Sequence, residues 1–103
     1  MSQRQHALDE VSIPRLRRGV RLKHDTVREK WTLLGPERIF ELDPIAVEIV
    51  KRIDGKRDLS AIVDELADIY NAGRDQIMAD VQEFLGQLAE RRAIETSPPS
   101  RVS

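Results

Sequence analysis

Apolar residues in the first half of the chain alternate with polar ones, which is the period of a β-strand that buries one face. In residues 19–25, Val20, Leu22 and His24 alternate with the basic residues Arg21 and Lys23. Residues 27–34 and 38–42 show the same alternation, and the Gly-Pro-Glu sequence between them is typical of a turn. The pattern predicts a three-stranded antiparallel meander.

After Pro44 the spacing of apolar residues changes to three and four, as on one face of an α-helix. Asp43 can accept hydrogen bonds from the first turn of this helix, and Gly55 ends it. A second helix, capped by Asp58, ends at an Asn-Ala-Gly sequence, and a third ends near Arg92. Three strands followed by three helices predict an α+β domain of winged-helix type, in which the helices cover one face of the sheet.

The two ends of the chain show no sustained period. Residues 1–14 are predicted to form a flexible arm, and residues 96–103, rich in Ser and Pro, a disordered tail. The 103 residues are enough for one domain, which is expected over residues 15–95. No apolar run approaches the roughly 20 residues that a membrane span needs, so we expect no membrane association and a cytoplasmic location.

Residues that could carry catalysis do not come together in the sequence. His6 lies in the predicted arm, and His24 has no second histidine near it. Cysteine is absent, which excludes a disulfide or a thiolate metal site, and no glycine-rich phosphate loop is present. We therefore expect a protein that is not an enzyme and has no catalytic residues, no metal and no cofactor.

Charge is distributed unevenly along a chain whose net charge is only −1. Between Leu59 and Glu90 every charged residue except Arg74 is acidic, and nucleic-acid phosphates would repel such helices. The basic run of residues 15–23 lies in the predicted arm and first strand. This distribution favours a peptide or protein partner over nucleic acid.

The predicted third strand, residues 38–42, raises the question of what pairs with its edge. An exposed strand edge can accept an extended peptide as an additional strand. An apolar flank of the third helix either forms the other wall of such a groove or extends the core; its residues are Met78, Leu85 and Ala89. The opposite flank is polar; its residues are Asp80, Gln87 and Arg91.

The sequence RIFELDPIAVEIVKRIDGKRDLSAIVDELADIY, followed by DVQEFLGQLAERRAI, resembles the family of coenzyme pyrroloquinoline quinone (PQQ) synthesis protein D, PqqD. The shared features are an apolar strand that runs into Leu-Asp, an Asp-Gly turn and a capped helix that ends in Tyr. The upstream stretch PRLRRGVRLKHDTVREKWTLLGPERIFELD is also similar to the family. The resemblance covers residues 14–95.

This resemblance implies a winged-helix-like fold without catalysis of its own and a role as a peptide chaperone in PQQ biosynthesis. Such a protein binds the ribosomal precursor peptide PqqA and presents it to PqqE, a radical S-adenosylmethionine enzyme. In related recognition domains the peptide adds beside the third strand, against the third helix. The peptide-binding residues implied here are Arg38, Ile39, Phe40, Glu41, Leu42, Met78, Leu85 and Ala89.

Two other functions remain open from the sequence. One is a recognition domain of a different ribosomal-peptide modification pathway. The other is a winged-helix DNA-binding protein, whose affinity would fall steeply with salt. The sequence leaves the surface that contacts PqqE open, with residues 15–23 as one candidate.

Overall fold

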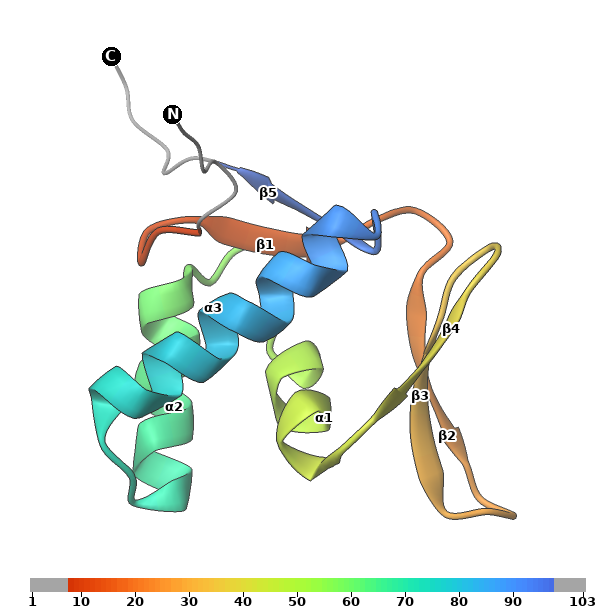
Figure 1. The fold of residues 1–103 in the computed structure, drawn as a ribbon, viewed down its shortest axis with the longest axis horizontal. Coiled ribbons are helices and arrows are strands. Elements are labelled where there is room, and N and C mark those ends of the chain that lie inside the picture. Colours follow the sequence, from red (N-terminus) through yellow and green to blue (C-terminus); the bar gives the residue numbers. More distant parts are fainter. Residues whose placement is uncertain (1–7, 98–103) are drawn as a thin grey trace.

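The structure, a computed structural model, describes residues 8–97. It contains three helices, a three-stranded sheet and a separate two-stranded ribbon (Figure 1). The elements in chain order are β1 (Ile13–Leu16), β2 (Arg21–Asp25), β3 (Lys30–Leu34), β4 (Ile39–Leu42), α1 (Pro44–Lys51), α2 (Leu59–Tyr70), α3 (Arg74–Glu90) and β5 (Ile94–Ser97).

Strands β2, β3 and β4 form the antiparallel meander that the alternating pattern predicts. Leu22 is paired with Leu33, and Leu33 with Phe40, so these three side chains form one row across the sheet. The row faces the helices, and its central member, Leu33, is completely buried. The predicted α+β class, with three strands followed by three helices, is confirmed.

The ribbon of β1 and β5 was not predicted. Ile13 is paired with Ser97, and Leu16 with Ile94, so the ribbon joins the two ends of the described chain. Pro14 is buried in β1, and Leu8 upstream of it belongs to the core. The predicted arm of residues 1–14 and tail of residues 96–103 therefore overlap the folded structure. Residues 1–7 and 98–103 lie outside the described residues.

Capping residues fix where the helices begin and end. The Asp43 carboxylate accepts a hydrogen bond from the Ala46 N–H at 2.8 Å, and Asp58 accepts one from the Ala61 N–H at 2.9 Å. Asn71 ends α2 in the left-handed conformation, with φ of 52°.

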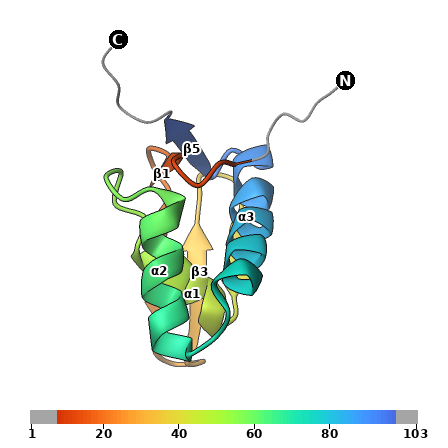
Figure 2. The same ribbon diagram turned by 90° about the vertical axis from the view of Figure 1, so that its left-hand side faces the viewer.

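Helices α2 and α3 pack against each other, and Figure 2 shows them in front of α1 and the sheet. The fully or almost fully buried side chains at the centre are Leu33, Ile49, Leu59, Ile62, Val63, Leu66, Val81 and Leu85.

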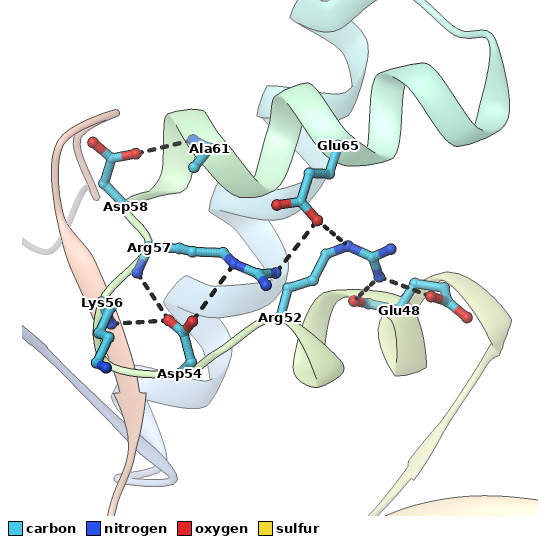
Figure 3. A network of polar contacts seen from close by, with 8 residues as sticks. All are labelled: Glu48, Arg52, Asp54, Lys56, Arg57, Asp58, Ala61 and Glu65. Atoms are coloured by element: carbon cyan, nitrogen blue, oxygen red, sulfur yellow. Dashed lines mark hydrogen bonds and ion pairs between the residues drawn. The ribbon is translucent and has the colours of Figure 1, made fainter.

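A network of ion pairs joins α1 to α2 (Figure 3). The Arg52 Nε donates to Glu65 at 3.0 Å, and its Nη1 donates to Glu48 at 2.8 Å. The Arg57 guanidinium also donates to Glu65, at 3.3 Å. Only 16% of the Arg52 side chain is exposed, so this arginine is the best shielded member of its ion pairs. Its hydrogen bond to Glu48 holds the pKa of that carboxyl below its ordinary value.

Candidate functional site

Strand β4 forms one edge of the sheet, and among residues 8–97 it pairs with β3 alone. The Gly35 N–H donates to the Arg38 carbonyl at 2.8 Å, which fixes the hydrogen-bonding phase of the hairpin. Since backbone groups of successive residues point to opposite sides of an antiparallel strand, those of Phe40 and Leu42 face β3. The N–H and C=O groups of Ile39 and Glu41 consequently point outward, along an edge that has no strand partner in the described structure.

A groove lies between this edge and α3. It consists of three hollows of about 380, 140 and 270 Å³. The first and second share Phe40 and Arg91 as lining residues, and the second and third share Glu41 and Phe84. We call the continuous depression the β4–α3 groove. Its lining extends along β4 from Arg38 to Asp43, which is a shape that an extended chain could follow.

The floor of the β4–α3 groove is apolar in its middle hollow. Phe40 and Leu42 from β4 line the middle hollow together with Phe84 and Leu88 from α3. Phe40, Leu42 and Phe84 are half-buried, so each leaves apolar surface that a ligand could cover. Gln87 and Arg91 of α3 form the polar rim of the same hollow.

The two ends of the groove differ in charge. Arg38, Arg91 and Arg92 line the end beside the β3–β4 turn, together with Glu37 and Glu90. The opposite end is acidic; its charged lining residues are Glu41, Asp43 and Asp80. We call these the arginine end and the carboxylate end.

The predicted strand residues lie at this groove. Arg38, Phe40, Glu41 and Leu42 line it. The Ile39 side chain is 69% exposed, and its backbone contributes to the open edge. That these five residues bind a peptide stays a prediction.

The predicted helix residues lie elsewhere. Leu85 is completely buried in the core, and Met78 and Ala89 pack against that core without lining any of the three hollows described here. Gln82, on the same flank, donates to the Leu8 carbonyl at 2.7 Å, so the segment before β1 covers this flank. Of the two meanings that the sequence left open for this flank, the structure supports the extension of the core.

The groove instead uses the flank of α3 that carries Asp80, Gln87 and Arg91, with Phe84 and Leu88 beside them. The sequence showed the three polar residues as one flank of the helix, and the family resemblance implied that the groove lies on the other, apolar flank. In the sequence, Phe84 could have indicated which side of α3 lines the groove, because it lies at the border between the apolar stripe and the polar flank. A large side chain at such a border is suited to line a groove rather than to fill the core.

The described structure offers no group of three His, Cys, Asp or Glu side chains that could hold a metal ion. None of the described helices is long and apolar enough to cross a membrane.

Comparison with known proteins identifies the family. The family model of coenzyme PQQ synthesis protein D (PqqD) matches residues 30–94. A Xanthomonas euvesicatoria protein named PqqA binding protein is 48% identical over 83 residues, which cover 81% of this chain and 90% of that protein. A protein of the same name from Rhodopseudomonas palustris is 44% identical over 102 residues, covering 95% of this chain and 100% of that protein. The chain belongs to the PqqD family.

Solved PqqD structures have the same fold. The NMR structure of the PqqD part of Methylobacterium extorquens PqqCD, described as a stand-alone recognition element for ribosomally synthesised and modified peptides, matches with a TM-score of 0.77 at 44% identity. The match covers 86% of this chain and 95% of that one. The crystal structure of PqqD from Xanthomonas campestris matches with a TM-score of 0.54, also at 44% identity, over 76% and 87% of the two chains.

These relatives confirm the resemblance seen in the sequence. Their names describe a binding protein and a recognition element. Membership of this family of recognition elements agrees with the non-catalytic role that the sequence predicts.

Proposed function

We propose that this protein binds the precursor peptide PqqA, in PQQ biosynthesis, by adding part of the peptide as a strand to β4. The observation that carries the proposal is the open edge of Ile39 and Glu41 beside the apolar floor of the β4–α3 groove. The names of the relatives, PqqA binding protein, support this choice of ligand. The five strand residues predicted from the sequence keep their role in this proposal, whereas Phe84, Gln87, Leu88 and Arg91 replace the three predicted helix residues.

The free energy available in the groove suits reversible binding. The four outward backbone groups of Ile39 and Glu41 can form four hydrogen bonds, each contributing roughly 0.5–1.5 kcal/mol net. Apolar peptide side chains that cover Phe40 and Phe84 add to this, and ordering of the peptide opposes it. A net value near −8 kcal/mol, which corresponds to a dissociation constant of about 1 μM, is within reach.

We propose further that the bound peptide is presented to the radical S-adenosylmethionine enzyme PqqE in the cytoplasm. Binding through one short strand supports such a role, because a peptide held at four residues of β4 keeps the rest of its length accessible. The basic stretch of residues 15–23 stays a candidate contact for PqqE. Arg15 and Arg17 in it are 3.5 and 3.3 Å from Glu95, which leaves Arg18, Arg21 and Lys23 as its more available cations.

Amide NMR of the isotope-labelled full chain, titrated with unlabelled PqqA, tests the proposed site. The largest shifts are expected at Ile39 and Glu41, whose N–H groups gain partners, and along α3 from Phe84 to Arg91. Met78, on the covered flank, serves as an internal control and should shift little. A scrambled PqqA peptide of the same composition controls for non-specific association.

Absence of saturable shifts at high peptide concentration would contradict PqqA as the ligand. Other precursor peptides and duplex DNA would then be titrated in the same way. Saturable shifts confined to the Met78 flank would contradict strand addition at β4.

A further inference from the structure

The charges at the two ends of the β4–α3 groove provide information that backbone pairing alone does not. At the arginine end, three arginines outnumber the two glutamates that line the same hollow. None of Arg38, Arg91 and Arg92 forms an ion pair with another residue of the described range 8–97. Their guanidinium groups are therefore available to a ligand.

The carboxylate end contains no cationic lining residue to neutralise it. Asp80 accepts only a neutral amide hydrogen bond from Gln76, at 3.3 Å, among the described residues. Asp43 accepts the Ala46 N–H at 2.8 Å, and Glu41 lies 3.9 Å from the exposed Lys30 ammonium. An ammonium or guanidinium group of a ligand would thus meet net negative charge at this end.

The separation of the two ends fixes a length along the ligand. Arg38 and Asp43, just outside the two ends of β4, are five residues apart in the sequence, which corresponds to about 17 Å of extended chain. Because alternate residues of a strand face the same side, both charged side chains of a peptide strand beside β4 can face α3 only if they are an even number of residues apart, about four or six for this length.

The direction of the strand fixes the order of those charges. β4 runs from the arginine end to the carboxylate end, whereas α3 runs from Asp80 to Arg91 in the opposite direction. The existing sheet is antiparallel throughout, and antiparallel pairing is the more stable arrangement per residue. A strand added antiparallel to β4 begins at the carboxylate end and finishes at the arginine end.

We infer that the groove selects a peptide segment in which a basic residue precedes an acidic residue by about four or six positions, an even spacing that lets both side chains face α3. The basic side chain lies beside Asp80 and Asp43, and the acidic side chain lies beside Arg91 and Arg38. This charge order sets both the direction and the register of the bound strand. The inference rests on the proposed function, because it takes PqqA as the ligand and strand addition to β4 as the mode of binding.

Double-mutant cycles between protein and peptide test the charge order. The protein variants are Asp80→Lys and Arg91→Glu, and the peptides are PqqA and forms of it in which single charged residues are reversed. Because both protein side chains are exposed, each matched pair should show a coupling of roughly 2- to 5-fold in affinity. The coupling should shrink when the salt concentration is raised from about 0.05 to 0.5 M.

Matched control variants change the same charges away from the groove. Asp68→Lys alters an exposed residue of α2, and Arg28→Glu alters an exposed residue in the turn between β2 and β3. Neither should couple to any charged residue of the peptide. Thermal unfolding of every variant establishes that the fold is retained.

The expected result is that a basic peptide residue couples to Asp80 and that an acidic residue, about four or six positions later, couples to Arg91. Binding of PqqA to wild-type protein without any coupling, or with the acidic residue first, would overturn the inference while leaving the proposed function intact. If PqqA does not bind wild-type protein at all, both the proposed function and the inference fail.

Discussion

Replacement of Glu41 by proline should change the open edge of β4 without changing the pairing of β4 with β3. The Glu41 N–H points away from β3, so proline at this position removes a hydrogen-bond donor that the domain itself does not use. Proline is tolerated on an edge strand where its missing N–H faces solvent. The residue before it, Phe40, already has the extended conformation that a following proline requires. The change therefore acts on the added peptide strand and spares the sheet.

The expected loss of affinity follows from one missing backbone hydrogen bond. Such a bond contributes roughly 0.5–1.5 kcal/mol net, so its loss should raise the dissociation constant roughly 2- to 12-fold. The proline ring also occupies part of the edge, so we expect a value in the upper half of this range. Stability should fall by only about 1 kcal/mol, because Glu41 is exposed and its 3.9 Å contact with Lys30 is a surface ion pair.

Isothermal titration calorimetry measures the dissociation constant of PqqA for the Glu41→Pro variant, and two further variants serve as controls. Glu41→Ala removes the same side chain but keeps the N–H, so it controls for the lost carboxylate. Phe40→Pro removes an N–H that bonds to β3, and it should destabilise the sheet strongly. If Glu41→Pro binds PqqA as tightly as Glu41→Ala does, the peptide does not pair with this edge.

Three further predictions concern stability and can be checked by chemical denaturation. Leu85→Ala should lower the free energy of unfolding by about 2–5 kcal/mol, because it opens a cavity in the core, and the folded variant should keep its affinity for PqqA. A loss of affinity without a loss of stability would instead place Leu85 in the binding site. A chain of residues 15–95 should be less stable than a chain of residues 8–97 by at least about 2 kcal/mol, because it lacks the buried Leu8 and half of the β1–β5 ribbon. Equal stability of the two chains would support the domain boundaries expected from the sequence. The stabilisation from the Glu48–Arg52 pair should be fully present above the ordinary Glu pKa of 4.5 and should disappear as pH falls through the lower pKa of the folded state. Arg52→Met should therefore reduce the loss of stability at acid pH, and an unchanged acid dependence would exclude this ion pair as a cause of that loss.

The elements that sequence analysis found are those whose signal is local. Alternation predicts β2, β3 and β4, and the caps at Asp43 and Asp58 mark two helix starts, all within stretches of a few residues. The ribbon of β1 and β5 was not predicted because neither IPRL nor IETS shows a clear alternation of apolar and polar residues, and β1 contains a proline. Its pairing joins the two ends of the chain, such as Arg15 with Glu95, and no local pattern contains that information.

The same distinction explains the result at the groove. The open edge could be predicted, because strand order follows from a meander of short connections. The wall on α3 could not, since helical periodicity separates the flanks of a helix without showing which flank another segment covers. Leu8 decides this point, because its carbonyl accepts a hydrogen bond from Gln82 and its side chain enters the core next to the apolar flank. Residue 8 lies inside the segment that the sequence suggested to be a flexible arm.

A strand edge that is open to a peptide is also open to pairing with other copies of the protein. The strand β4 has only four residues, and two of them supply all of its outward groups, so backbone pairing alone is weak. A second copy of the domain would bring its own α3 beside its own β4, and the two helices would compete for the space over the joint. A free peptide has no such attachment, and it can cover Phe40 and Phe84 while it pairs. The position of α3 beside the edge thus favours an extended peptide over a folded copy of the same sheet.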